Sequence, residues 1–481
     1  MGELPVWSRQ PVLTTAVALG ALLTAFSQRY DYHRDELYFR MLEPAWGYVD
    51  QPPLAPLLAD LTQLLADQPW ALRLPSTIAV SLSVIVVTLV TRELGGGRAA
   101  QLIAAFAYAG SAAVMIFGHV LLTSTFDLLV WPLVCLFVLR GLLRGEGHWW
   151  VYAGLVAGLA SYDKLLVVWL LLGIGVGLLT VGPRHVLLSR PVLAACGVCL
   201  LLALPNVIYQ ATHGWPQLEM GAALAENNAG EVRWFMWVLL VLVLGPPLVP
   251  IWVAGIVALL RRPEWRPARC LVVAFGVVLL FTFVSGAQPH YPTGLVVVFL
   301  AVGAVPAAEL VARSRPWRGV LAAGLVLNAG VSALIGLPVL SVATLGETPV
   351  PDLSIVAADQ VGWRRYVEQI ASVTAEVDVQ TVVTSNYGEA GAVARYAPEL
   401  EVYSGQNALY DVGPPPTSVS SVVFVGEQLS TARELFDECV VATRLDNRVG
   451  VDNEEQGVPV AVCSGLRQPW SVSWPRLHHL D

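Results

Sequence analysis

The sequence predicts a polytopic α-helical membrane protein with a small extracytoplasmic α/β domain at its C-terminus. Three observations predict this class: an apolar composition, apolar stretches that recur up to about residue 340, and ordinary polarity from about residue 345 onward. Of the 481 residues, 56% are hydrophobic and 13% are charged, whereas soluble domains are about 45–50% apolar and about 25% charged. The net charge of −8 comes without a basic, aromatic-rich patch, so nucleic acid is not an expected partner.

The apolar stretches predict about eleven transmembrane helices, because each approaches the roughly 20 residues that a helix needs to cross a bilayer. They cover about 11–27, 76–92, 99–117, 120–140, 149–162, 165–182, 191–210, 234–260, 268–285, 292–312 and 318–340. The stretch 149–162 is short and the stretch 120–140 carries Asp127, so the count is good to about one helix.

The arginines predict the orientation, because short cytoplasmic loops are enriched in Lys and Arg. With a cytoplasmic N-terminus, the inside loops contain Arg9, Arg92, Arg98, Arg140, Arg144, Arg184, Arg190, Arg261, Arg262, Arg266, Arg269, Arg313, Arg315 and Arg318. The outside loops between helices are nearly free of basic residues, apart from the opening segment of about 28–75 and Lys164, the single lysine. An alternative for the first helix is a signal peptide ending near Ala25-Phe26-Ser27, which would leave the orientation of the rest unchanged.

The predicted domains are a transmembrane domain, 1–344, and a soluble extracytoplasmic α/β domain, 345–481. In the tail, strand-like runs such as "TVVTS" and "SVVFVG" alternate with helix-like runs such as "GWRRYVEQIASVTAEV" and "STARELFDECV". The predicted compartment permits a disulfide between Cys439 and Cys463, and whether they are bridged is left open. Cys196 and Cys199 form a CxxC inside an apolar stretch, where packed small residues are the favoured interpretation over a redox or metal site.

The opening outside segment combines carboxylates with aromatic residues. Between Tyr30 and Leu61 it contains Asp31, Asp35, Glu36, Glu43, Asp50 and Asp60. The neighbours of Asp35-Glu36 suggest a short interfacial helix that lies on the membrane, and the alternative is a solvated acidic face on a loop. A carboxyl group desolvated near the bilayer has a raised pKa, which suits a general base. Asp50 precedes the rigid Pro52-Pro53 turn, either as a cap or turn residue or as part of the same pocket as Asp35.

Two cation candidates lie at predicted outer helix ends. Lys164, in "SYDKLL", is either a snorkelling lysine paired with Asp163 or a cation that binds a phosphate. His290 and Tyr291, in "QPHYPTG", belong either to an interfacial aromatic belt or to a site that recognises a headgroup phosphate.

Taken together, these motifs resemble a known family of membrane enzymes. The Asp-Glu pair after the first helix, "GYVDQPPLAPLL" and the "HYP" turn occur in the same order in the PMT/ArnT-like glycosyltransferases, the glycosyltransferase 39 superfamily of GT-C fold. "NVIYQATHGWPQLE" resembles another stretch of its bacterial members, and "TSNYGEAGAVARYAPEL" and "YSGQN" resemble their periplasmic domain. The resemblance therefore covers most of the chain and implies a bacterial, actinobacterial protein of the plasma membrane.

The resemblance implies transfer of a hexose or pentose from a polyprenyl-phosphate donor to a hydroxyl of a protein, polysaccharide or lipid acceptor, with inversion, on the outer face of the membrane. Asp35 would be the base, next to Glu36 as the second catalytic carboxylate. The sugar or acceptor pocket would contain Asp50, Tyr48, Gln51 and Tyr38, and the lipid-phosphate site Lys164, His290, Tyr291 and Arg34. Family members often carry Lys or Arg near the late turn, where this chain has Gln288 and His290. No metal ligands are assigned, and a divalent metal is left open.

A multi-spanning transporter or lipid flippase is the alternative from another class. Transporters place ionisable groups near the midplane and often contain inverted repeats, whereas this sequence has no visible internal repeat and gathers its polar residues on one predicted face. A receptor or assembly protein with an outer sensor domain would not need the acidic motifs.

Overall fold

The computed structural model describes residues 4–286 and 288–480, and the chain divides into two compact units. The first unit contains Met1–Phe26, Gln51–Leu54 and Arg73–Leu337. The second contains Ser27–Asp50, Ala55–Leu72 and Pro338–Asp481. Most of the acidic opening segment therefore folds with the C-terminal part of the chain, although it follows the first apolar helix in the sequence.

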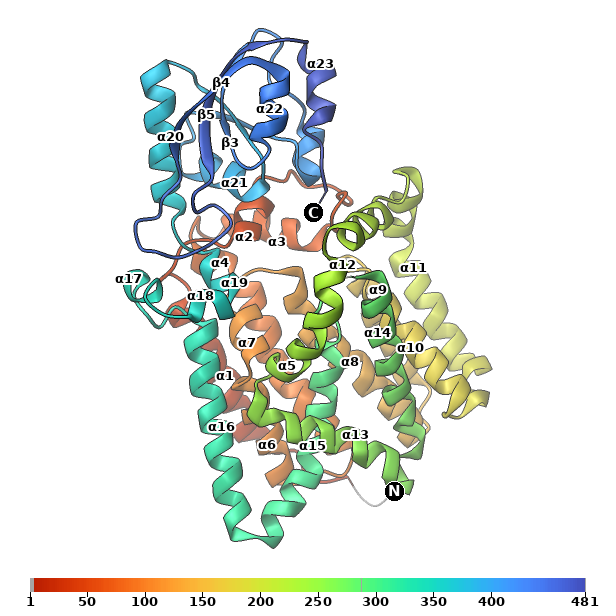
Figure 1. Cartoon of the computed structure of the whole chain (residues 1–481). Helices are drawn as coiled ribbons and strands as arrows, with labels where there is room; N and C mark the ends of the chain where they lie inside the picture. Colours follow the sequence, from red (N-terminus) through yellow and green to blue (C-terminus); the bar gives the residue numbers. More distant parts are fainter. Residues whose placement is uncertain (1–3, 287, 481) are drawn as a thin grey trace. The chain divides into compact units, whose positions relative to one another are not determined.

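The first unit consists of helices, and every predicted apolar stretch overlaps at least one of them (Figure 1). The helices are α1 Arg9–Phe26, α5 Leu74–Glu93, α6 Arg98–Ala109, α7 Ala112–Phe117, α8 Thr123–Arg144, α9 His148–Ala160, α10 Val167–Thr180, α11 Arg190–Thr212, α12 Pro216–Leu242, α13 Val249–Arg261, α14 Cys270–Ser285, α15 Thr293–Arg313 and α16 Arg315–Gly336. Three 3₁₀ helices join them, η1 Arg184–Leu188, η2 Pro246–Leu248 and η3 Pro263–Arg269.

The predicted count of about eleven spans is not confirmed. Within the described residues, 6 helices are long and apolar enough to cross a membrane, and a bent pair, Ala229–Leu242 with Pro246–Arg261, raises this to 7 if it is one span. Two predicted spans are interrupted. The stretch 99–117 divides into α6 and α7, and the stretch 234–260 bends by 72° between α12 and α13. Gly245, with φ of 103°, lies in that bend, and Pro246 and Pro247 follow it.

Small residues bring the helices of the first unit close together. A Cβ at Gly303 of α15 would clash with the carbonyl oxygen of Ile251 in α13, and a Cβ at Gly255 of α13 would clash with that of Phe299 in α15. Gly158 of α9 packs in the same way against Cys199 of α11. Such contacts are typical of membrane helices, which gain little from burying apolar surface against lipid.

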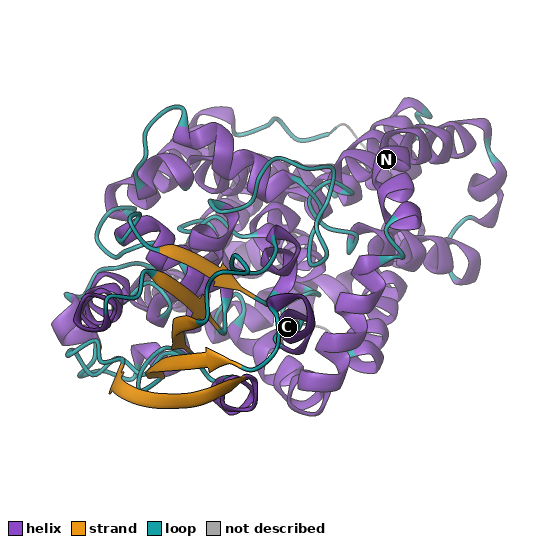
Figure 2. Ribbon diagram, turned by 90° about the horizontal axis from the view of Figure 1, so that it is seen from above, coloured by secondary structure: helices purple, strands orange, loops and turns teal. Residues whose placement is uncertain are grey.

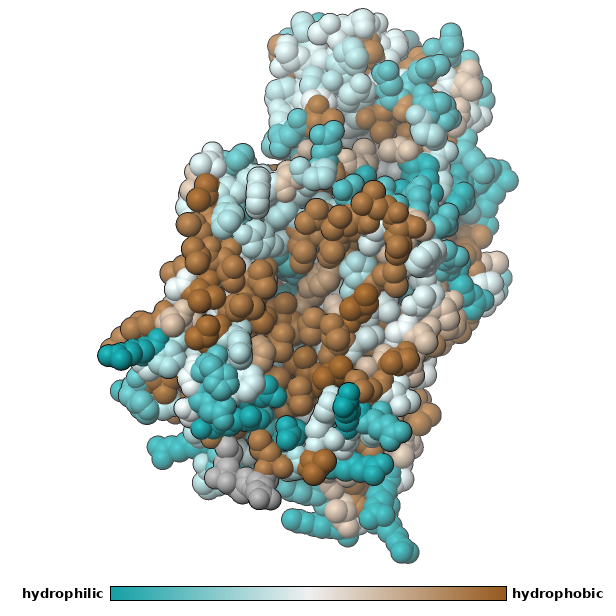
Figure 3. Space-filling model, turned by 180° about the vertical axis from the view of Figure 1, so that it is seen from behind, coloured by the Kyte–Doolittle hydropathy of each residue, from teal (hydrophilic) through white to brown (hydrophobic). Residues whose placement is uncertain are grey.

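The outward faces of these helices remain apolar. Leu200 and Leu201 of α11 and Val326 and Leu327 of α16 are all more than 60% exposed. Figure 3 shows hydrophobic side chains gathered over the helices of the first unit, while the surface of the sheet-bearing unit is mostly polar. The CxxC of α11 is not a disulfide, since Cys196 and Cys199 are both free.

The second unit is built around a mixed five-stranded sheet in the order β2-β1-β3-β5-β4 (Figure 2). The strands are β1 Thr381–Thr384, β2 Glu401–Ser404, β3 Ser421–Val425, β4 Phe436–Arg444 and β5 Pro459–Leu466. β1 is parallel to β2 and β3, and β5 is antiparallel to β3 and β4. The predicted α/β class of the tail is therefore confirmed.

Helices and short turns complete the second unit. They are α2 Arg34–Phe39, α3 Leu54–Gln63 (whose first residue belongs to the first unit), α4 Pro69–Leu72, α17 Val342–Leu345, α18 Val350–Leu353, α19 Ile355–Ala358, α20 Trp363–Val377, α21 Tyr387–Tyr396, α22 Leu429–Leu435, α23 Trp470–Ser473, η4 Asn407–Val412 and η5 Trp474–Arg476. The core contains the inward-facing Val383, Val422 and Phe424 together with Trp470.

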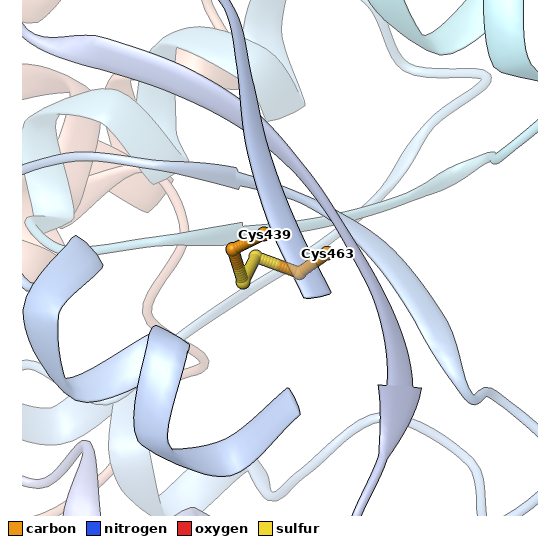
Figure 4. The surroundings of a disulfide bond; sticks show 2 residues. All are labelled: Cys439 and Cys463. Atoms are coloured by element: carbon orange, nitrogen blue, oxygen red, sulfur yellow. A yellow bond between two sulfur atoms is a disulfide. The ribbon is translucent and has the colours of Figure 1, made fainter. Parts of the chain in front are cut away.

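One prediction in the tail is wrong. "STARELFDECV" was expected to be a single helix, but α22 ends at Leu435 and the chain continues as β4 from Phe436. The physical reason is strand pairing, since Cys439 lies opposite Cys463 of β5. A disulfide joins these two cysteines (Figure 4), which decides the question that the sequence left open.

Candidate functional site

Asp35 and Glu36 lie in the first turn of the short helix α2, and both take part in the hydrogen bonds of its N-terminal cap. The ring nitrogen Nδ1 of His33 accepts a hydrogen bond from the backbone N–H of Asp35 at 3.1 Å, and the carboxylate of Glu36 accepts one from the backbone N–H of His33 at 2.8 Å. This reciprocal arrangement is a capping box. Glu36 is fully buried, so the geometry gives it a structural role and does not support the catalytic role expected for it.

The sequence suggested that the helix α2 lies on the membrane surface. In the structure this helix is buried. Leu37, Tyr38 and Phe39 are each less than 5% exposed. A Cβ at Gly391 of α21 would clash with Leu37, so the two helices of the second unit pack closely. Of the aromatic residues of this segment, Tyr38 packs against Tyr387 of α21.

Asp35 and Asp50 are linked by two tyrosines. The hydroxyl of Tyr387, at the start of α21, donates to Asp35 Oδ1 at 3.0 Å, and the hydroxyl of Tyr38 donates to Asp50 Oδ1 at 3.0 Å. The rings of Tyr38 and Tyr387 are 4.6 Å apart between centroids. The Asp35 side chain is 30% exposed, so it has room to accept a further hydrogen bond. We call these four residues the carboxylate–tyrosine group.

The surroundings of Asp50 raise the pKa of its carboxyl group into the neutral pH range. Burial raises the pKa of Asp50 to about 7, the hydrogen bond from Tyr38 opposes this rise, and the charge of Asp35 adds to it. The hydroxyl of Tyr38 also accepts from the backbone N–H of Ala408 at 3.2 Å. The side chain of Asp50 is therefore held by a hydrogen bond inside the second unit, and its place in a substrate pocket stays a prediction.

Two other predicted pocket residues have different surroundings. The hydroxyl of Tyr48 donates to the carbonyl of Glu43 at 2.6 Å and accepts from the N–H of Ala45 at 3.2 Å, so it stabilises its own loop. Gln51 belongs to the first unit and is 7% exposed. Its Nε2 has no hydrogen-bond partner among the described residues.

Arg34, a predicted phosphate ligand, is held inside the second unit. It forms an ion pair with Glu454, and its guanidinium lies 4.8 Å from the centroid of the Tyr387 ring. Because Arg34 is only 8% exposed, it supports Tyr387 and is a poor candidate for a headgroup phosphate.

The first unit brings the other three predicted cation-site residues together. Lys164 Nζ donates to Ser124 Oγ at 3.0 Å and lies 4.5 Å from the centroid of the Tyr291 ring. Ser124 Oγ is 2.8 Å from His290 Nε2. Lys164 lies between α9 and α10, Ser124 begins α8, and the "HYP" turn joins α14 to α15; Ala287 before this turn lies outside the described residues. We call these four residues the lysine site.

Lys164 carries the positive charge of this site. Burial and the neighbouring Lys164 lower the pKa of His290 to about 3, so His290 is neutral at physiological pH. No direct ion pair of Lys164 with Asp163 is present among the described residues, but the charge of Lys164 acts on the buried Asp163 and Asp127. Lys164 therefore has two carboxyl groups nearby as well as the Ser124 hydroxyl, and both interpretations of this lysine stay predictions.

Sequence reasoning missed two members of these groups. Ser124 had no motif to mark it, because it begins an apolar stretch. Tyr387 lies in "TSNYGEAGAVARYAPEL", which resembled the family's periplasmic domain but did not indicate a contact with Asp35. In the structure, Asn386 and Glu389 of this stretch form a capping box at the start of α21. In the described part of the chain, no group of three or more His, Cys, Asp or Glu side chains is placed to hold a metal ion.

Comparisons with known proteins agree with this architecture. The family model described as dolichyl-phosphate-mannose-protein mannosyltransferase matches residues 50–209. A search of curated proteins finds no match. The solved structure of ArnT from Cupriavidus metallidurans bound to undecaprenyl phosphate is similar with a TM-score of 0.66 and 16% identity, covering 94% of this chain and 98% of that one.

A second structure extends the comparison. The arabinofuranosyltransferase AftD from Mycobacteria is similar with a TM-score of 0.56 and 15% identity, covering 96% of this chain but 40% of that one. The apolar helices and these matches make the chain a multi-pass membrane protein. Its fold is that of the GT-C-type glycosyltransferases, which confirms the resemblance to the PMT/ArnT-like group that its motifs indicated.

Proposed function

We propose that this protein transfers a sugar from a polyprenyl-phosphate donor to an acceptor hydroxyl on the outer face of the membrane, with inversion at the anomeric carbon. The observation that carries the proposal is the likeness to ArnT along nearly the full length of both chains, in a structure that holds undecaprenyl phosphate. The family model that matches residues 50–209 describes a transferase with a dolichyl-phosphate donor, which is the same donor class.

The outer face is favoured by two independent features. The arginine pattern favours a cytoplasmic N-terminus, and with this orientation the opening segment would lie outside. The Cys439–Cys463 disulfide belongs to the same compact unit as that segment, and disulfides persist in oxidising compartments outside the cytoplasm. We infer a multi-pass protein of a bacterial plasma membrane.

Asp35 is the proposed general base. In an inverting transfer, a carboxylate accepts the acceptor's proton while its oxygen attacks the anomeric carbon and the bond to the lipid phosphate breaks. Asp35 accepts one hydrogen bond, from Tyr387, and is partly exposed, so an acceptor hydroxyl can reach its carboxylate. Tyr387 orients this carboxylate, and Asp50 with Tyr38 offers hydrogen bonds to the hydroxyls of the sugar or acceptor.

Lys164 is the proposed partner of the lipid phosphate. Negative charge grows on that phosphate as the glycosidic bond breaks, and a cation fixed nearby stabilises it. The hydroxyl of Ser124 accepts a hydrogen bond from the ammonium group, and His290 Nε2 in turn lies within hydrogen-bond distance of that hydroxyl. The ammonium group also lies 4.5 Å from the centroid of the Tyr291 ring, within the range of a cation–π contact.

The proposal is tested with purified full-length protein in detergent and a radiolabelled polyprenyl-phosphate hexose or pentose. Cell-envelope extract supplies acceptors, and the measurement is the label that leaves the lipid and enters the acceptor fraction. We expect donor-dependent transfer by the wild type. Asp411→Asn, which alters an exposed carboxylate elsewhere in the second unit, serves as the control variant. Absence of transfer with every donor would contradict the proposal and favour a lipid or solute transporter.

A further inference from the structure

The second unit contains a cavity that the proposed reaction does not use. Its volume is about 440 Å³, and its walls come from residues 28–32 and 360–365 together with Arg395 and Asn447, among others. None of the carboxylate–tyrosine group lines it. Small-molecule sites are typically about 300–1,000 Å³, so the cavity is large enough for a compact ligand.

Arginines outnumber carboxylates among the residues that line this cavity. Four arginines line it, Arg29, Arg364, Arg365 and Arg395, against one carboxylate among its lining residues, Asp31. That carboxylate is already engaged, because the hydroxyl of Tyr396 donates to it and Arg364 Nε lies 3.6 Å from it. The remaining positive charge therefore favours an anion.

Two of the arginines keep donors for a ligand. Arg365 pairs with Glu368 at 2.9 Å and Arg395 with Asp67 at 3.2 Å, but the side chains of Glu368 and Asp67 are 64% and 52% exposed, and exposed ion pairs are weak. The Nε atoms of both arginines are buried and have no partner among the described residues. A guanidinium fork matches the oxygen geometry of a phosphate or a carboxylate.

A neutral side chain in the same wall favours a hydroxylated ligand. Gln360 is 2% exposed and its Nε2 donates to the carbonyl of Val356 at 2.7 Å. Its Oε1 is buried without a hydrogen-bond partner in the described chain. An unpaired buried acceptor is costly, and a ligand hydroxyl would supply the missing donor.

We propose that this cavity binds an anionic saccharide, a sugar that carries a phosphate or a carboxylate group. The arginines hold the anionic group and Gln360 Oε1 accepts from a sugar hydroxyl. The proposal concerns binding only and does not rest on the proposed transferase reaction.

Calorimetric titration of the full-length protein in detergent tests this directly. The probes are glucose 1-phosphate, glucuronate, glucose and inorganic phosphate. We expect the anionic sugars to bind at least about tenfold more tightly than glucose, because charge-assisted hydrogen bonds are the strong ones. They should also bind more tightly than inorganic phosphate, and raising the salt concentration should weaken them. The tighter binder of glucose 1-phosphate and glucuronate would show whether the bound anionic group is a phosphate or a carboxylate. Binding of glucose as tight as that of the anionic sugars, or no binding of any probe, would overturn the proposal.

Matched variants locate the site. Arg365→Gln and Arg395→Gln should each weaken the anionic sugars by about tenfold, whereas Arg433→Gln, on an exposed arginine of α22 outside the cavity, should have no effect. Gln360→Met should weaken the sugars and leave inorganic phosphate unchanged. Equal effects of Arg365→Gln and Arg433→Gln would contradict the placement. The salt dependence of the wild type provides the test if a variant does not fold.

Discussion

A buried carboxylate of the helical unit and two carboxylates of the sheet-bearing unit have different hydrogen-bond partners. In the helical unit, Glu93 is fully buried but accepts hydrogen bonds from both Arg140, at 3.2 Å, and Arg144, at 2.7 Å, whereas Lys164 donates to a neutral serine. In the sheet-bearing unit, Asp35 and Asp50 accept hydrogen bonds from tyrosines and not from arginines.

This contrast separates structural charge from functional charge. A buried charge that is paired with opposite charges is costly to separate from them, because removal of one partner leaves the other uncompensated. A charge with neutral partners remains available to a substrate. By this criterion Glu93 is structural, whereas Asp35 and Asp50 remain available, and they and Lys164 are the groups that we propose to act.

The largest expected effect comes from Asp35→Asn. The amide keeps the shape of the side chain but cannot take a proton, so transfer should fall by about 10²–10⁴-fold. The assay is label transfer from the lipid donor, with the thermal unfolding temperature as the check on folding. The exposed Asp411→Asn should keep full activity. A folded Asp35→Asn protein with wild-type transfer would remove Asp35 from the role of base.

The disulfide should stabilise only the sheet-bearing unit. It closes a segment with a sequence separation of 24, for which a stabilisation of about 2–4 kcal/mol is expected. The double substitution Cys439→Ala with Cys463→Ala should lower the unfolding midpoint of this unit, followed by the environment of its tryptophans. Cys196→Ala, at an exposed free cysteine of α11, is the matched control. An unchanged midpoint in the double variant would show that strand pairing alone fixes β4 and β5.

Close helix contacts should matter only in the helical unit. Gly303→Val inserts a side chain where α13 approaches α15, and we expect a loss of about 1–3 kcal/mol from overpacking. Gly276→Val changes a glycine of α14 that has open space around it. The measurement is the detergent stability of the two variants. A similar loss of stability in both variants would show that the close helix contact at Gly303 does not cause the destabilisation.

The smallest expected effect is a pH dependence that comes from Asp50. Its folded pKa of about 7 lies above the ordinary value of 3.8, so the carboxylate forms only as the pH rises through 7. If the ionised form binds the substrate, transfer at pH 6 should be about one tenth of that at pH 8. Asp50→Asn should flatten this profile.

The same shift predicts the sign of a stability change. Because the folded state holds the Asp50 proton more tightly than the unfolded state, this group's contribution to stability falls as the pH rises from about 4 to about 7. The wild type should lose this contribution and Asp50→Asn should not. A loss of stability on acidification through this window that depends on Asp50 would contradict the sign.

The sequence predicted the local features of this molecule well and its long-range contacts poorly. Apolar length predicted helices, and alternation predicted the strands "TVVTS" and "SVVFVG", because both signals lie within a few turns of chain. The pairing of β4 with β5 overrode the helical pattern of "FDECV", since the partner strand lies elsewhere in the sequence.

The candidate site follows the same division. Asp35, Asp50, Lys164 and His290 carry their own chemical signal in short motifs. The hydrogen bond from Tyr387 to Asp35 spans 352 residues, and no periodicity reaches that far. The capping role of the buried Glu36 could not be predicted from the sequence either, because a capping box depends on the backbone of His33 as much as on residue type.

The central claim is that the lysine site binds the lipid phosphate while the carboxylate–tyrosine group performs the transfer. The most direct test measures bound and transferred label for the same radiolabelled polyprenyl-phosphate sugar in Asp35→Asn and Lys164→Met. We predict that Asp35→Asn binds the donor like the wild type and does not transfer it, and that Lys164→Met binds it about 10–100-fold more weakly, as for the loss of one charge-assisted hydrogen bond. Loss of donor binding in Asp35→Asn, or full binding in Lys164→Met, would contradict this division of roles.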